Sequence, residues 1–114
     1  MKKVIYVALF AFAINASAQE EFWIANGFST GEQFLSMSET EKSAFSMGTV
    51  NGMLLAPLFG APKEQMLRIE TCLVGMTNSQ VTAIFEKYLR DNPSRWHQTP
   101  HVPMYSALIQ ACPE

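Results

Sequence analysis

Three hydroxyl side chains, each followed three residues later by a glutamine or glutamate, restrict this chain to short helices more than any other sequence feature does. The pairs are Thr30 with Gln33, Ser38 with Glu41, and Thr77 with Gln80. In such a capping box each side chain accepts a hydrogen bond from the backbone N–H of the other residue, at the start of a helix. We therefore expect helices to begin directly after Thr30, Ser38 and Thr77.

Apolar residues recur at helical spacing behind two of these boxes and again near the C-terminus. The inward-facing sets predicted by this spacing are Ala44, Met47, Leu54, Leu55 and Leu58; Val81, Ile84, Phe85, Tyr88 and Leu89; and, after a helix start at Thr99-Pro100, Val102, Tyr105, Leu108, Ile109 and Cys112. Glu86, Lys87 and Arg90 lie opposite the second set, and we assign them to solvent. Pro62 suits the first turn of a further brief helix ending near Cys72. Because no segment alternates as a strand does, the predicted fold is all-α, a small single-domain helical bundle.

Gly48 and Gly52 lie inside the second predicted helix. Each costs a helix about 1 kcal/mol relative to alanine, so we expect another backbone to cross closely on that side. Asn51 projects near the middle of the apolar stripe. We interpret it as a hydrogen-bonded core amide in preference to a binding residue, because buried polar groups are normally satisfied.

The N-terminus has the pattern of a secretory signal peptide. Lys2 and Lys3 precede an apolar run of eleven residues, Val4 to Ile14, and the small residues Ala16-Ser17-Ala18 follow. Eleven apolar residues are too few to cross a bilayer, which takes about 20. We expect cleavage of residues 1–18, a mature domain at residues 19–114 and a periplasmic location without membrane attachment.

Charge argues against two classes of partner. Removing 18 of the 114 residues leaves 96, with six basic and ten acidic side chains and a net charge of −4. Nucleic acids and anionic membrane surfaces are bound by clusters of Lys and Arg, and the sequence has none. We therefore expect neither of them as a partner.

Cys72 and Cys112 are the two cysteines of the chain. In a small exported domain such a pair is more often a disulfide than a metal or redox site, so we predict that they are bonded. The bridge would close a loop of about forty residues and stabilise the fold by roughly 4 kcal/mol in the chain-entropy treatment. It would also bring the last helix against the helix that follows Thr77.

The other side chains give little support to catalysis or metal binding. His97 and His101 are four residues apart, as in some zinc sites, but Pro100 lies between them and no third ligand is evident. A cysteine nucleophile would need a free thiol, and we predict that both cysteines are bonded. The sequence also contains no Gly-rich loop of the kind that binds phosphate. We expect no enzyme activity, no metal and no cofactor, and a protein that acts by binding another protein.

Two connections between helices are candidate contacts for such a partner. The first consists of Leu58, Phe59, Gly60 and Lys63, and the second of Arg95, Trp96 and His97. Pro57 and Pro62 place Leu58 and Phe59 in a turn, where we expect them to fold inward over the core, with outward projection toward a partner as the alternative. Trp and Arg often dominate binding energy, but Trp96 packed under the last helix is an equal alternative.

Several short motifs in a fixed order carry a family resemblance. Between the cysteines they are the Thr77-to-Gln80 helix start, Lys87-Tyr88-Leu89, Asn92-Pro93, a turn with His and Pro, and Ala111-Cys112-Pro113. Upstream, Phe45 to Gly52 looks like an aromatic-x-x-Gly-Val helix. In this order, over most of the mature chain, the sequence resembles the Rap1a/Tai family of type VI secretion immunity proteins. The second cysteine pair usual in that family would fall near Met37 and Lys42, which are not cysteines here.

The resemblance implies a periplasmic immunity protein. Such a protein is a helical homodimer that binds an injected, peptidoglycan-cleaving amidase effector through a protruding loop and blocks its active-site cleft. One alternative is a periplasmic acid-stress chaperone (holdase), which is also short, helical and disulfide-linked. Those chaperones depend on dense charge, whereas charged residues make up 16% of this chain. A small envelope enzyme is the third hypothesis.

Overall fold

A computed structural model of the protein describes residues 27–113, so the predicted signal peptide, residues 1–18, lies outside the described residues. The chain passes through α1 (Gly31–Ser36), α2 (Glu39–Leu54), the 3₁₀ helix η1 (Ala56–Phe59), α3 (Lys63–Leu73), α4 (Asn78–Asp91), the 3₁₀ helix η2 (Pro93–Arg95) and α5 (His101–Ala111). Every regular element between residues 27 and 113 is a helix, which confirms the predicted all-α fold.

All three capping boxes form, and each begins the helix predicted from it. At α1, the Gln33 N–H donates to Thr30 Oγ1 (3.2 Å) and the Thr30 N–H donates to Gln33 Oε1 (2.8 Å). The same reciprocal bonds link Ser38 with Glu41 and Thr77 with Gln80. The short-range patterns therefore located these three helix starts correctly.

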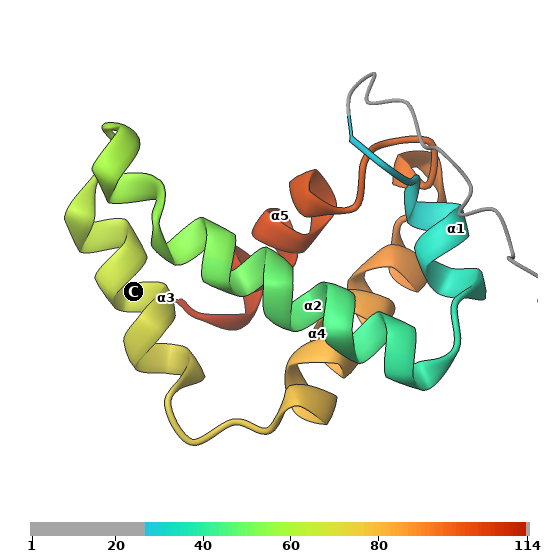
Figure 1. Ribbon diagram of the computed structural model, residues 1–114, viewed down its shortest axis with the longest axis horizontal. Coiled ribbons are helices and arrows are strands. Elements are labelled where there is room, and N and C mark those ends of the chain that lie inside the picture. The colour runs from blue at the N-terminus through green and yellow to red at the C-terminus, as the bar shows by residue number, and fades with distance from the viewer. Residues whose placement is uncertain (1–26, 114) are drawn as a thin grey trace, which may run out of the picture.

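The core lies where α4 packs against α5 and α2 crosses α4, while α1 and α3 close opposite ends of the molecule (Figure 1). Its buried members are Phe34 of α1, Met66 and Ile69 of α3, Phe85 and Leu89 of α4, and Met104, Ala107 and Leu108 of α5. The predicted contact between α4 and α5 is confirmed. Val102, which the spacing placed inside, is 42% exposed, and the buried residues of this turn of α5 are instead Pro103 and Met104.

The predicted disulfide is present. Cys72, near the end of α3, is bonded to Cys112, directly after α5, with their Cα atoms 5.7 Å apart. Farther along the same two helices, Gln65 Nε2 donates to the Tyr105 hydroxyl. The bridge and this hydrogen bond fasten α3 to α5 at two levels.

The predicted inward face of α2 is wrong. Of that set, Met47 is 47% exposed and Leu55 is 52% exposed, and Ala44 and Leu58 are exposed as well. The fully buried side chains of α2 are instead polar, namely those of Lys42 and Ser46. The helix has apolar residues around most of its circumference, so apolar spacing alone could not select the face that meets the core.

The crossing expected at Gly48 and Gly52 is also absent. A Cβ atom at either glycine would meet no atom of residues 27–113 within 4 Å, and both positions are exposed. Asn51, between them, is exposed and is not a core amide. Among the residues that the structure describes, no other helix therefore lies in direct contact with α2 at these two glycines.

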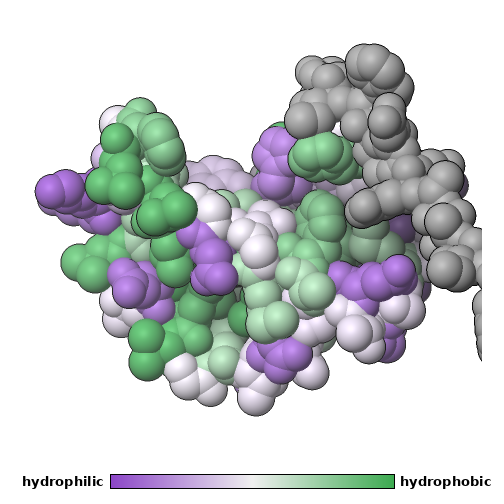
Figure 2. Space-filling view, in the orientation of Figure 1, coloured by the Kyte–Doolittle hydropathy of each residue, from purple (hydrophilic) through white to green (hydrophobic). Residues whose placement is uncertain are grey.

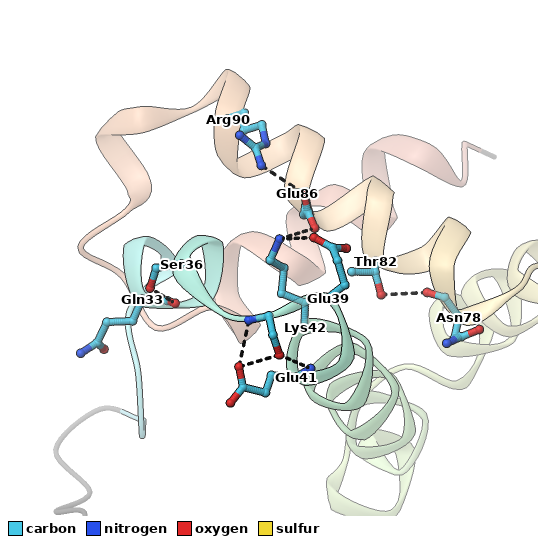
Figure 3. A network of polar contacts seen from close by, with 10 residues as sticks. Gln33, Ser36, Glu39, Glu41, Lys42, Asn78, Thr82, Glu86 and Arg90 are labelled. Atoms are coloured by element: carbon cyan, nitrogen blue, oxygen red, sulfur yellow. Dashed lines mark hydrogen bonds and ion pairs between the residues drawn. The ribbon is translucent and has the colours of Figure 1, made fainter.

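Lys42 is buried because two carboxylates meet its ammonium group (Figure 3). Its Nζ donates to Glu39 Oε1 at 2.7 Å and to Glu86 Oε1 at 2.9 Å, and Arg90 Nη2 donates to the other Glu86 oxygen at 3.2 Å. Glu86, which we had assigned to solvent, retains 18% of its side-chain exposure. This network joins α2 to α4 across 44 residues of sequence.

The network shifts two pKa values in opposite directions. Hydrogen bonds with Glu39 and then Glu86 raise the pKa of Lys42 above its ordinary 10.5. Burial raises the pKa of Glu86, but the hydrogen bonds from Lys42 and Arg90 together outweigh burial and hold that pKa below 4.5. At the start of α2, the Ser38 N–H lowers the pKa of Glu41 as well.

These shifts predict a stability plateau with a decline at each end. The depressed pKa of Glu86 gives stability that is present above pH 4.5 and lost as Glu86 protonates in acid, and the raised pKa of Lys42 gives stability that is lost above pH 10.5. We expect the free energy of unfolding in urea to be highest between about pH 5 and about pH 10. Lys42→Met should abolish the alkaline decline, and an unchanged decline in that variant would contradict the assignment.

Candidate protein-binding surface

An apolar protrusion stands at the end of the molecule where α2 passes into η1. We define it by Leu55, Leu58 and Phe59, which are 52%, 78% and 87% exposed. Figure 2 shows hydrophobic surface gathered on a projecting corner, at the place where Figure 1 draws the segment between α2 and α3. The expectation that Leu58 and Phe59 fold inward is therefore wrong, and the outward alternative is the observed one.

The backbone of the protrusion has little freedom to relax. Pro57 sits in the first turn of η1, and the Leu58 N–H donates to Leu55 O at 2.9 Å. Gly60 ends η1 with a φ of 99°, a left-handed conformation that other residues adopt only with strain. The Gly60 N–H donates back to Pro57 O at 3.2 Å. These features hold Leu58 and Phe59 outward, because turning them inward would require a different backbone path.

The base of the protrusion is the first turn of α3. Lys63 lies there and is exposed, so the first predicted contact set, residues 58–60 with Lys63, comes together at one place. Met66 and Ile69 anchor α3 in the core, and the disulfide ties the far end of α3 to α5. The protrusion is thus mounted on a fixed helix.

The second predicted contact set is mostly engaged within the molecule. Arg95 donates to the Tyr88 hydroxyl at 2.6 Å and to Ser106 Oγ at 3.0 Å, and its guanidinium lies 5.9 Å from the centre of the Tyr88 ring. Trp96 Nε1 donates to Leu89 O at 2.6 Å. His97 is the exposed member of the set. Arg95 therefore joins α4 to α5 and Trp96 is bonded to α4, so the first set is the more accessible surface.

A shallow apolar groove lies between α2 and the first turns of α5. It has a volume of about 590 Å³, and we call it the α2–α5 groove. Gly48 and Gly52 line its α2 side, His101 and Val102 line its α5 side, and Phe28 stands at its edge, 65% exposed. Figure 2 shows the surface dipping between the η1 protrusion and the start of α5. We did not predict this groove from the sequence, although the two glycines one turn apart were a signal of it.

The described residues offer no evident reactive centre. Within residues 27–113, no three side chains of His, Cys, Asp or Glu gather to hold a metal ion. His97 is exposed, and His101 Nε2 lies 3.4 Å from Thr99 Oγ1. In the same range no helix is both long and apolar enough to span a membrane. What this surface offers chemically is apolar contact area.

Comparison of the chain with protein-family models, with curated proteins and with solved structures gives no match.

Proposed function

We propose that this protein is a periplasmic immunity protein, which binds a type VI secreted peptidoglycan amidase effector and blocks its active-site cleft. The observation that carries the proposal is the outward placement of Leu58 and Phe59, at 78% and 87% exposure, on a backbone fixed by Pro57 and Gly60. Fully exposed neighbouring apolar side chains are unfavourable in water unless a partner covers them. The class of partner follows from the Rap1a/Tai resemblance of the sequence.

The shape of the protrusion suits a cleft. A narrow 3₁₀ turn that presents Leu58 and Phe59 can enter a concave apolar site, which is the usual form of an enzyme active site. Because the turn is already ordered, binding loses little conformational freedom, and this favours affinity. Lys63 places a positive charge beside the turn, which suits a partner whose cleft has an acidic rim.

The same resemblance implies a homodimer. A dimer would present two protrusions, so one assembly could hold two effector molecules. The mass of the complex by light scattering, measured in the experiment below, reports both the oligomeric state and the stoichiometry.

The test is inhibition of candidate amidases, first those encoded beside the gene for this protein. We expect an equimolar amount to stop peptidoglycan cleavage. The double variant Leu58→Asp with Phe59→Ala should weaken binding at least about 100-fold, because a hot-spot pair contributes about 3 kcal/mol or more. Its melting temperature should stay within a few degrees of wild type, since both side chains are exposed. Binding is measured by calorimetry.

Val74→Asp is the matched control. Val74 is 77% exposed, like Leu58, but follows α3 outside the protrusion, so this variant should bind like wild type. Equal loss of binding in both variants would remove the protrusion from the proposal. If no amidase is inhibited and the protein instead unfolds at pH 3 and suppresses aggregation of other proteins, the acid-stress chaperone hypothesis replaces it.

A further inference from the structure

The two cysteines of the disulfide differ in their exposure. Cys112, directly after α5, is 1% exposed and belongs to the core, whereas Cys72, near the end of α3, is partly exposed. Figure 1 shows the chain after α5 running back to α3, where the two residues are bonded. The bridge therefore joins a residue at the surface of one helix to a buried residue at the end of the other.

A shallow hollow of about 490 Å³ lies against Cys72 on the outer side of α3. The residues that line it are Glu64, Leu67, Arg68, Thr71, Cys72 and Pro113. Leu67 and Thr71 are exposed, so the hollow opens to the outside of the molecule. Cys112 does not belong to this lining. A small molecule that enters the hollow therefore meets the Cys72 side of the bridge.

This difference in access decides how a thiol can open the bridge. A thiolate forms a bond to one sulfur of a disulfide while the other sulfur leaves with the electron pair, and the sulfur that is attacked must be within reach. Attack at Cys72 forms a mixed disulfide there and breaks the bond to Cys112, whose sulfur leaves as a thiolate and then takes up a proton. Attack at Cys112 would require the thiolate to enter the core. Release of a charged sulfur into the core slows the exchange, but it does not change which sulfur is reached.

We propose that Cys72 is a thiol-exchange site, at which a small thiol forms a mixed disulfide and frees Cys112. The exchange removes the covalent link between α3 and α5. The helix α3 is then held by noncovalent contacts, among them the hydrogen bond from Gln65 Nε2 to the Tyr105 hydroxyl. The mounting of the η1 protrusion on α3 thereby becomes sensitive to the thiols around the protein. This inference does not depend on the immunity function.

Trapping of the mixed disulfide tests the proposal. Folded protein is incubated briefly with 2-mercaptoethanol, and excess iodoacetamide then caps every thiol that has been released. Trypsin cuts after Arg68, Lys87 and Arg95, so the two cysteines fall in different peptides and mass spectrometry locates the adduct. We expect mercaptoethanol on Cys72, with Cys112 capped, at least about tenfold more often than the reverse. In guanidinium chloride, where both sulfurs are accessible, the two adducts should form within about twofold of each other.

The variant Phe85→Leu separates exchange at the folded surface from exchange in unfolded molecules. Phe85 is buried on α4 and does not line the hollow, so this variant is less stable while access to Cys72 is unchanged. Exchange at the folded surface should keep the wild-type rate within about twofold, whereas exchange through unfolding would become several-fold faster. Adducts shared equally between the sulfurs of the folded protein, or found mainly on Cys112, would overturn the proposal. A rate that rises in Phe85→Leu, or a folded protein that forms no adduct, would overturn it as well.

Discussion

Replacing both cysteines by alanine should lower the free energy of unfolding by about 4 kcal/mol and the melting temperature by about 20 °C. Cys72 and Cys112 are 40 residues apart in sequence, so the bridge removes much of the freedom of the unfolded chain. It also holds the end of α3, whose other buried anchors are Met66 and Ile69. Thermal unfolding followed by circular dichroism measures the change.

Reduction of the wild-type protein provides the control for that substitution. Dithiothreitol breaks the bridge and leaves both side chains nearly unchanged, so the reduced protein and the double-alanine variant should melt within a few degrees of each other. A drop of less than 5 °C in both would mean that packing of α3 against α5, and not the bridge, holds this end of the fold.

Phe85→Ala should cost about as much by a different mechanism. Phe85 is fully buried on α4, and removing a buried phenylalanine side chain typically costs about 3–5 kcal/mol through lost burial and the cavity left behind. Urea unfolding measures this loss. Should the alanine variant fail to fold, Phe85→Leu fills most of the cavity and should lose less than about 1.5 kcal/mol.

Phe59→Ala makes the same chemical change at the opposite extreme of exposure. Phe59 is 87% exposed, so its removal should change the free energy of unfolding by no more than about 0.5 kcal/mol. We expect Phe59→Ala to affect partner binding and Phe85→Ala to affect stability. A large loss of stability in Phe59→Ala would show that the protrusion belongs to the structural core in solution.

The features that the sequence predicted correctly depend on short range or on strong periodicity. The reciprocal bonds of Thr77 with Gln80 lie within one helical turn, and α4 has its apolar residues on one side, so its start and its inward face followed from local residues. The disulfide followed from the presence of two cysteines in a chain whose N-terminus has the pattern of a signal peptide. None of these inferences required knowledge of the tertiary arrangement.

The face of α2 could not be predicted in that way. Lys42 is buried because Glu86, 44 residues later in the sequence, lies opposite it. No local sequence pattern predicts that these two residues form an ion pair. Once Lys42 faces α4, Met47 and Leu55 must turn away from the core. The same rotation leaves Gly48 and Gly52 facing the groove. A single long-range ion pair therefore accounts for the wrongly predicted inward face of α2, for the absent helix crossing and for the α2–α5 groove that we did not predict.

The position of the disulfide has a practical consequence for attaching this protein to anything else. Because Cys112 is bonded to Cys72 near the end of α3, a fusion at the C-terminus would emerge beside α3 (Figure 1), whereas the α2–α5 groove is lined by Gly27 and the start of α5. A C-terminal label or surface anchor therefore keeps the groove unobstructed.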